Sequence, residues 1–411
     1  MAVEVRAIGA NELEQWVATS HIAFHVGRSA AQEATFRRDV LKQDLGRTLA
    51  AFDGNDLAGT LRSFPTELSL PGGTSLTADA LSAVSVLPTH RRRGLLTRML
   101  TADLHAARER GEAASILLAA EYPIYGRFGF GPATERADYA IDTHAASFTR
   151  AAPGTLELLE PARLRDLAPS IFDRFRRERP GQIDRDWSSW DARLGIVETP
   201  WADRDAALRC VAYCAADGAV EGYATYRAEP RSEHHVPRST LEVRELVAVS
   251  AEAYLGLWRF CCEVDLVSQV TANMRCVDEP LAWLLHNPRA ALHQTARTDM
   301  LWLRPLDVAR TLAARRYACE GRLVLELDDP LGLCGGRFVL EGGPDGATCR
   351  ASDAAADLSL GVRALGALSL GGAGVRTLAD AGLVEANAPG ALLSAERLFR
   401  WPVAPWCYTF F

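Results

Sequence analysis

The chain has 411 residues, with 45 Lys and Arg against 52 Asp and Glu, and Lys42 is its only lysine. P-loop NTPases, pyridoxal-phosphate enzymes and protein kinases each need a lysine in a defined setting, and no glycine loop precedes Lys42, so the composition disfavours all three classes. The net charge of -7 and the pI near 5.8 argue against a sequence-independent nucleic-acid binder, which needs a cationic surface. We therefore expect no nucleic-acid partner.

Cysteine usage and apolar content indicate a globular protein of a reducing compartment. At roughly 150 residues per domain, the length predicts two or three domains. The sequence shows neither a signal peptide nor an apolar run of the ~20 residues that a membrane span requires. The nine cysteines all follow residue 209 and form no Cys-x-x-Cys pair. We therefore expect free thiols, no metal site, no membrane contact and a cytoplasmic location.

The first third of the chain predicts strands joined by one crossover helix. Pro65 and the turn at residues 71–73 separate the early strands. A change to a helical apolar period at Gly94 predicts a helix that stops at Gly111. Since a crossover joins the strands on either side of this helix, we expect them to pair in parallel. The expected strands are residues 57–64, 67–70, 81–87 and 113–119.

A second unit repeats this plan, and a third region follows an α+β pattern. The turn Asp217-Gly218 predicts a hairpin, and the start of the next helix carries Glu252 where the first unit has arginines. The chain ends in an aromatic run that we expect to be buried. The second unit comprises strands 209–215, 219–228 and 242–249 and helix 251–264. The third comprises strands 322–327, 336–340 and 353–360, a helix opening at 305, and helices 362–369 and 392–399.

Two loops carry candidate chemistry. The first runs from Val84 to Thr97, between a strand and a helix, and includes three consecutive arginines before Gly94. Free amides at a helix start bind anions, glycine allows close approach, and arginines add charged donors, so this loop predicts a phosphate site. The alternative for the arginines alone is a solvated basic turn. The second loop, residues 122–131, is rich in glycine and aromatic residues, and alone it is typical of a core turn.

Together these motifs resemble the acetyl-CoA site of the GNAT superfamily, and more specifically the Eis (enhanced intracellular survival) family of N-acetyltransferases. The resemblance rests on Arg91-x-x-Gly94, on the run Ile-Tyr-Gly-Arg-Phe-Gly-Phe at residues 124–130, and on the final phenylalanine. It implies an α/β and α+β protein with three domains. These are an N-terminal GNAT domain (1–150), a GNAT-like domain without a cofactor loop (151–299) and a sterol-carrier-protein-like domain (300–411).

The resemblance also implies a role for individual residues. Tyr125 would be the general acid that protonates the CoA sulfur, and the terminal carboxylate of Phe411 would be the general base. The end of a strand would pair with the pantetheine arm, the loop and first helical turn would hold the pyrophosphate, and two residues after the next strand would lie near the acetyl group. The strand positions that would pair with the pantetheine arm are Val84, Ser85 and Val86. The positions that would hold the pyrophosphate are Arg91, Arg92, Arg93, Gly94, Leu95, Leu96 and Thr97. The positions near the acetyl group are Ala120 and Glu121.

The proposed acid and base agree with elementary acid–base chemistry. A phenol with a reference pKa of about 10 can donate to a thiolate. An α-carboxylate with a reference pKa of about 3.5 becomes a base only after desolvation raises that pKa. The aromatic tail at Trp406, Tyr408, Phe410 and Phe411 would supply such a setting. The alternative is that the tail merely fills a groove between domains.

The expected activity is acetyl-CoA-dependent N-acetylation of primary amines, by direct attack and without a metal. The expected acceptor is a small polyamine or aminoglycoside-like molecule. Two departures from the family are Leu96, where the superfamily often has a small residue, and residues 21–32, which lack the acids that line the family's polyamine pockets. The alternatives are a protein-lysine N-acetyltransferase and a lipid carrier built on the third domain. The resemblance also implies a homohexamer, arranged as a trimer of dimers.

Overall fold

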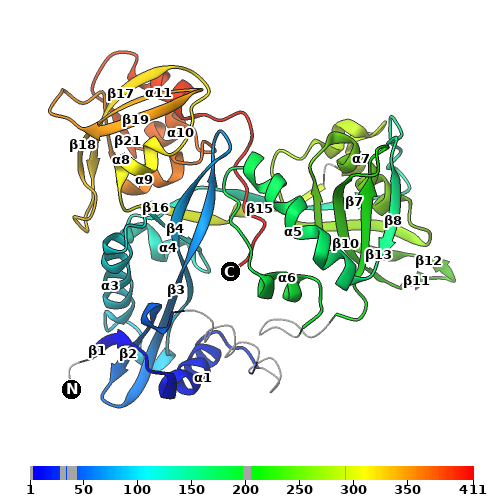
Figure 1. Ribbon diagram of the computed structural model, residues 1–411, viewed down its shortest axis with the longest axis horizontal. Helices are drawn as coiled ribbons and strands as arrows, with labels where there is room; N and C mark the ends of the chain where they lie inside the picture. The colour runs from blue at the N-terminus through cyan, green and yellow to red at the C-terminus, as the bar shows by residue number, and fades with distance from the viewer. Residues whose placement is uncertain (1–2, 28–33, 35–43, 198–204, 292) are drawn as a thin grey trace.

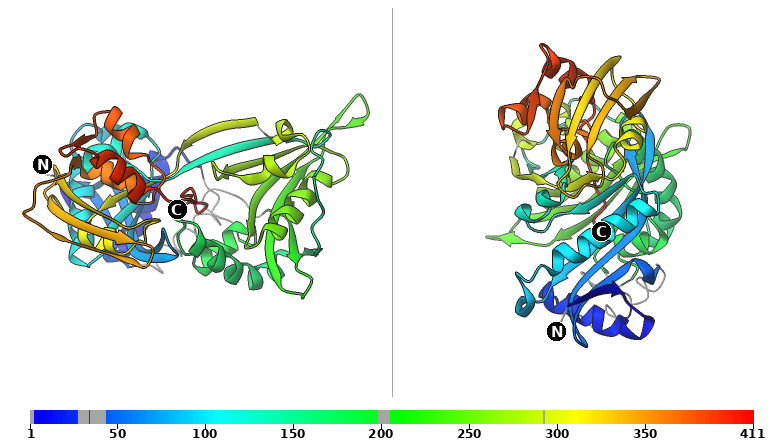
Figure 2. Two further views of the ribbon diagram at one scale, coloured as in Figure 1. Left: turned by 90° about the horizontal axis from the view of Figure 1, so that it is seen from above. Right: turned by 90° about the vertical axis from the view of Figure 1, so that its left-hand side faces the viewer.

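A computed structural model describes residues 3–27, 34, 44–197, 205–291 and 293–411. Two seven-stranded sheets and one five-stranded sheet, each with its own helices, divide these residues into three parts (Figure 1). The third part packs against the first, and the second lies to their side (Figures 1 and 2). In Figure 1 and in the left view of Figure 2, the C-terminus lies between the first and second parts. Within the described residues, no helix combines the length and apolar character needed to cross a membrane.

The first sheet has the order β1-β2-β3-β4-β5-β16-β6. As expected, β4 and β5 pair in parallel, because α3 crosses over between them. The strands are β1 (Glu4–Ala7), β2 (Thr48–Asp53), β3 (Asp56–Leu70), β4 (Thr74–Val86), β5 (Ala114–Leu118), β6 (Gly131–Pro132) and β16 (Leu301–Pro305). The helices are α1 (Leu13–Ala23), α3 (Leu95–Glu109) and α4 (Tyr122–Tyr125).

The prediction that Pro65 divides two strands is wrong. β3 runs unbroken from Asp56 to Leu70, and Pro65 stands opposite Asp79 of β4. β2 pairs with β3 only as far as Arg62, so the proline lies where that edge of β3 has already lost its strand partner. A proline without an amide donor is tolerated at such a position.

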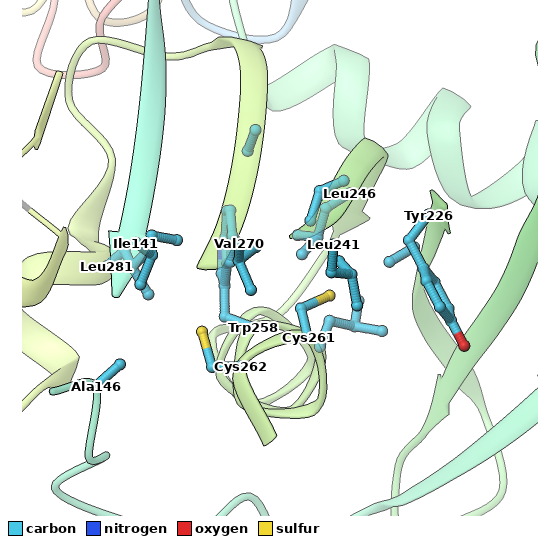
Figure 3. Packing of buried hydrophobic residues seen from close by; sticks show 14 of the residues in the cluster. Ile141, Ala146, Tyr226, Leu241, Leu246, Trp258, Cys261, Cys262, Val270 and Leu281 are labelled. Atoms are coloured by element: carbon cyan, nitrogen blue, oxygen red, sulfur yellow. The ribbon is translucent and has the colours of Figure 1, made fainter. Parts of the chain in front are cut away.

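The second sheet has the order β15-β7-β14-β13-β10-β9-β8 and packs on α7 (Ala251–Glu263). Figure 3 shows Trp258, Cys261 and Cys262 of α7 facing the strand residues Leu241 and Val270. The predicted hairpin and crossover are confirmed. The strands are β7 (Glu135–Asp142), β8 (Thr155–Leu159), β9 (Arg209–Cys214), β10 (Val220–Glu229), β13 (Ser239–Ala248), β14 (Val267–Arg275) and β15 (His293–Asp299); β11 (Ser232–Glu233) and β12 (Val236–Pro237) form a separate ribbon, and α5 (Pro161–Glu178) and α6 (Trp187–Arg193) complete this part.

The first and second sheets each contain a strand that the expected domain boundaries gave to another domain. β7 belongs to the second sheet, although the expected first domain extended to residue 150. β16 belongs to the first sheet, although the expected third domain began at residue 300. The reason is that β16 pairs with both β5 and β6, which places it between two strands from near the N-terminus. Strand patterns along the chain do not reveal such an exchange.

The third sheet has the order β19-β18-β17-β20-β21 and packs on four short helices. Leu365 and Phe399, from two of those helices, are buried in its core. The expected strand 353–360 begins only at Leu358. The strands are β17 (Gly321–Asp328), β18 (Gly336–Gly343), β19 (Gly346–Ala351), β20 (Leu358–Gly361) and β21 (Val384–Ala386), and the helices are α8 (Val308–Ala313), α9 (Val362–Leu368), α10 (Val375–Asp380) and α11 (Ala391–Phe399).

Candidate active site

The strands β4 and β5 separate at the end where the arginine-rich loop begins. They pair only over Ala78–Leu81 of β4, and β4 then continues along β3 to Val86. A bulge in β4 accompanies the separation: Ala83 has φ 51°, and the Thr60 hydroxyl hydrogen-bonds to the Ala83 carbonyl at 2.8 Å and to the Ser85 hydroxyl at 2.7 Å. Within the described chain, the backbone of residues 82–86 therefore has a strand partner on only one edge. An extended ligand can pair with the other edge.

The loop after β4 presents the uncapped start of α3. Gly94 has φ 77°, and a Cβ built on it would meet no atom within 4 Å. In the described residues, no side chain caps this helix. The first helical bond runs from the Arg98 amide to the Gly94 carbonyl at 3.1 Å, so the amides of Leu95, Leu96 and Thr97 precede the helical ladder. Such amides form an anion site.

The three arginines of the loop differ in their surroundings. Arg91 and Arg92 are exposed, and Arg92 has φ 61°. The Arg93 guanidinium instead donates to a carboxylate oxygen of Asp53, at 2.8 Å, and lowers the pKa of that carboxyl. The His90 ring lies 3.5 Å from the same carboxylate. Arg93 therefore ties the loop to the end of β2, which leaves Arg91 and Arg92 as exposed cationic side chains beside the helix start.

A buried polar network holds α3 on the first sheet. Asp103 of α3 accepts a hydrogen bond from Ser63 of β3, at 2.8 Å. Asp79 of β4 accepts from Arg47 at 2.7 Å, and Arg47 also donates to Glu112. Burial, and then the neighbouring Asp79 carboxylate, raise the pKa of Asp103 to about 8. Asp103 is thus protonated at neutral pH. Burial, and then the Glu112 carboxylate, also raise the pKa of Asp79, while the Arg47 guanidinium acts to lower it.

Tyr125 lies at the end of α4, beside the separated strands. Its side chain is buried in the cluster that α3 forms with the sheet, and its ring stands edge-on to Phe130 at 6.2 Å between centroids. Within the described residues, its hydroxyl has no hydrogen-bond partner. Burial, and then the carboxylate of Glu121, raise the pKa of Tyr125 to about 12. Its phenol therefore keeps its proton throughout the physiological range.

The glycines that follow Tyr125 permit close contact with the third part. A Cβ on Gly131 would lie 2.0 Å from the carbonyl oxygen of Arg363 in α9. Gly366, also in α9, faces the Leu303 carbonyl equally closely, at 2.1 Å. A larger residue at either position would separate α9 from β6 and β16. The glycine-rich turn thus allows α9 of the third part to pack closely against the segment that follows Tyr125.

The C-terminal tail is buried as far as Thr409. Trp406 and Tyr408 are at most 2% exposed. Phe410, in contrast, is 61% exposed. The expectation that its ring helps to form an apolar setting for the terminal carboxylate is therefore wrong. The other aromatic residues of the tail pack against the protein instead. The half-buried Phe411 ring meets Phe64 of β3 edge-on, with the ring centroids 5.8 Å apart.

Tyr125 and Phe411 belong to clusters on opposite faces of the first sheet. Leu117 of β5 packs with Tyr125 and α3, whereas its neighbour Leu118 packs with Phe64 and Phe411. Successive strand residues point to opposite faces. The two predicted catalytic groups therefore lie on either side of the sheet in which β4 and β5 separate. Ala120 and Glu121, directly after β5, are exposed at the same end.

Two further expectations concern cysteine and metal chemistry. All nine cysteines are free thiols, and six of them are buried. Across the described ranges, no group of three or more His, Cys, Asp and Glu side chains is placed to hold a metal ion. Residues 28–32, part of the acid-free stretch noted in the sequence, and Lys42 lie outside the described residues.

Comparison with known proteins identifies the class of fold. Residues 4–133 match an acetyltransferase (GNAT) domain, residues 181–310 match a second GNAT domain, and residues 308–408 match a sterol carrier protein domain. The chain is therefore an N-acetyltransferase of GNAT type with a sterol-carrier-protein-like domain. It is 38% identical, over 99% of both chains, to an uncharacterized N-acetyltransferase of Streptomyces griseus.

Two mycobacterial proteins narrow the class to one family. The chain is 37% identical to the N-acetyltransferase Eis of Mycobacterium tuberculosis, over 80% of this chain and 79% of the relative. The crystal structure of Eis1 from Mycobacterium abscessus superposes with a TM-score of 0.87 at 33% identity, covering 99% of this chain and 100% of that one. The chain belongs to the Eis family of N-acetyltransferases.

Several buried groups around the site carry no sequence signal. Asp79 and Asp103 lie within apolar strand and helix patterns, where an acid alone predicts nothing. Arg275 and Gln182 contact the tail from segments more than 120 residues away from it. Arg275 and Gln182 meet the tail only because the C-terminal segment packs against the second part of the molecule.

Proposed function

We propose that this protein is an acetyl-CoA-dependent N-acetyltransferase that acetylates the primary amine of a small polycationic molecule. The observation that carries the proposal is the separation of β4 and β5 directly before an uncapped helix start. This arrangement fits a ligand with an extended amide-bearing arm and a pyrophosphate. Bound acetyl-CoA supplies an activated acetyl thioester.

The chain's own groups divide the binding task by chemistry. The free backbone edge of Val84, Ser85 and Val86 pairs with the arm. The amides from Gly94 to Thr97 and the side chains of Arg91 and Arg92 hold the phosphates, while Arg93 keeps the loop on Asp53. Ala120 and Glu121 border the acetyl end, as their position after β5 favours. Charge-assisted donors and a helix start together make a strong phosphate site.

Tyr125 and the Phe411 carboxylate are proposed as acid and base. The raised pKa of Tyr125 favours a phenol that holds its proton until sulfur needs it. The carboxylate takes a proton from the attacking amine on the opposite face of the sheet. The buried tail and the Phe64 ring support a partly desolvated setting that makes the carboxylate a better base.

The acceptor, compartment and assembly belong to the same proposal. Small polyamines and aminoglycoside-like amines are the proposed acceptors. The nine free thiols favour a cytoplasmic location. A hexamer built as a trimer of dimers is proposed from family membership, and a mass measurement in solution tests it. A panel of polyamines, aminoglycosides and lysine peptides with labelled acetyl-CoA tests the acceptor; acetylation of the peptides alone would make the protein a protein-lysine acetyltransferase.

The acid is tested by Tyr125→Phe. We expect kcat to fall about a hundredfold, the scale of general acid catalysis, with the KM for acetyl-CoA unchanged. Because the pKa of Tyr125 is about 12, wild-type kcat is expected to show no descending limb between about pH 8 and pH 10. Tyr122→Phe, on the same short helix but 52% exposed, is the matched control and is expected to keep full turnover. Unchanged kcat in Tyr125→Phe would remove the assignment.

The base is tested by adding two glycines after Phe411. We expect turnover to be lost while acetyl-CoA still binds in calorimetry, since the carboxylate moves and the cofactor loop does not. The same two glycines added at the N-terminus serve as the control. A fully active C-terminal extension would show that the terminal carboxylate is not the base.

A further inference from the structure

The second sheet separates its strands in the same way as the first, but the gap is filled. β13 pairs in parallel with β14 only over Ser239–Val243. Past that point β13 carries a bulge against β10, where Arg244 is the extra residue. This is the geometry that exposes the backbone edge of β4 in the first sheet. In the second sheet, groups of the protein itself contact the corresponding edge.

The C-terminal tail supplies two of those groups. The Tyr408 hydroxyl donates to the Arg244 carbonyl of β13, at 3.1 Å. The Trp406 indole donates to the Met274 carbonyl of β14, at 2.7 Å. Met274 has φ 59°, and the Asp138 carboxylate accepts a hydrogen bond from its amide, so the strand is turned out of its ladder where the tail binds. One tail residue thus contacts each of the two separated strands.

Arg275 fills the space between the strands. Its guanidinium donates to the Leu246 carbonyl of β13 at 2.8 Å and pairs with Glu279 at 2.6 Å. The same guanidinium lies 4.9 Å from the Trp406 ring centroid and 5.3 Å from that of Tyr408. A fully buried cation stacked on two tail rings binds the tail to the sheet electrostatically as well as by packing.

The other side of the tail is held by the segment before α6. The Trp406 amide donates to the Pro180 carbonyl at 2.8 Å, and the Gln182 side chain accepts from the Tyr408 amide at 3.2 Å. Arg185 donates to the Thr409 hydroxyl at 2.9 Å. The tail is therefore enclosed between this segment and the second sheet up to Thr409, two residues before the carboxylate proposed as the base.

We propose that the second GNAT domain keeps its separated strands as a socket for the C-terminal tail, in which Tyr408, Trp406 and Arg275 are positioning residues for the terminal carboxylate. The domain thereby contributes to the reaction without binding acetyl-CoA. The catalytic part of this inference rests on the proposed function of Phe411; the socket itself rests on the contacts above.

The socket is tested by Tyr408→Phe, which removes a hydrogen bond and keeps the ring. The double variant Trp406→Phe, Tyr408→Phe also removes the indole donor and replaces the indole with a smaller aromatic ring. Carboxypeptidase A releases the terminal phenylalanines only from a detached tail. We expect release to be about fivefold faster in Tyr408→Phe, the effect of one hydrogen bond, and faster again in the double variant. Tyr317→Phe is the matched control, since it removes a buried tyrosine bond to the Leu312 carbonyl in the third part.

Kinetics on the same proteins separate the socket from the base. We expect kcat to fall about fivefold in Tyr408→Phe and more in the double variant, with the KM for acetyl-CoA unchanged. The control is expected to match wild type in both measurements, although it loses comparable thermal stability. Wild-type release rates in both tail variants would overturn the socket. Faster release with unchanged kcat would support the socket and overturn the carboxylate as base.

Discussion

The two GNAT domains repeat one strand-to-helix step and treat the start of the helix in opposite ways. In the first, α3 begins directly after Gly94, arginines precede it, and no side chain in the described part of the chain caps it. In the second, the Ser250 hydroxyl accepts from the Ala253 amide at 3.2 Å and donates to Glu221 at 2.6 Å, with Glu252 in the first turn. At this helix start a side chain already accepts from a free backbone amide, and nearby carboxylates would repel a phosphate. The helix start is therefore unsuited to binding a phosphate.

The domains also differ in the charge state of their buried acids. Asp103, in the first domain, lies near a second carboxylate and stays protonated. For Glu245, in the second, burial acts to raise the pKa, but Arg185 and Arg193 outweigh it and leave the pKa below its usual range. A buried carboxyl is thus neutral where acids outnumber close cations and ionised where arginines surround it. The same fold accommodates both solutions.

The largest expected effect comes from giving the first helix start the charge of the second. Gly94→Asp places a carboxylate among the free amides, and we expect the KM for acetyl-CoA to rise about a hundredfold, or ~3 kcal/mol. Gly94→Ala, whose Cβ enters open space, is the control for backbone strain and should cost far less affinity. Equal effects of the two variants would mean that conformation, not charge, decides binding at this loop.

A smaller effect concerns pH and stability. The folded-state pKa of Asp103, about 8, is above its ordinary value, so its stabilising contribution is complete at low pH and is lost as pH rises toward 8. Between pH 6 and pH 7.5, the free energy of unfolding of Asp103→Asn should therefore fall less steeply with pH than that of the wild type. The two slopes should differ by about 1.4 kcal/mol per pH unit. Urea unfolding at both pH values measures this slope.

Glu245→Gln provides the counterpart from the second domain. Because the pKa of Glu245 is lowered, this group stays ionised in both states above pH 6 and contributes no slope there. We expect the variant to be less stable at both pH values with an unchanged slope. A slope change in Glu245→Gln, and none in Asp103→Asn, would reverse the proposed charge states.

The smallest effect is expected at the second helix start. Ser250→Ala removes the cap of α7 and should lower the free energy of unfolding by about 1 kcal/mol, without changing acetyl-CoA affinity. Ser250→Thr keeps a capping hydroxyl and should retain most of that stability. Urea unfolding and calorimetry check the two quantities. A gain of acetyl-CoA binding in Ser250→Ala would show that the cap alone had closed this site.

Much of the fold, including the position of the arginine-rich loop before α3, could be predicted from local patterns. The change of apolar period at Gly94 predicted α3 to within a residue, and Asp217-Gly218 predicted the hairpin of β9 and β10. Pro65 misled because a proline is a strand breaker only where its amide is needed. The domain boundaries could not be predicted, since β7 and β16 pair with strands far away in the chain.

The sequence by itself indicated that any phosphate contacts would fall to arginines and backbone amides, because Lys42, its only lysine, is remote from both loops along the chain. Local motifs added the candidate acid and the loop glycine. Only the tertiary structure decided that Arg93 pairs with Asp53 and that the glycines after Tyr125 allow α9 to pack closely. It also decided that the tail binds to the second domain. Local sequence encodes periods and turns, whereas partners distant in the chain meet only when the sheets assemble.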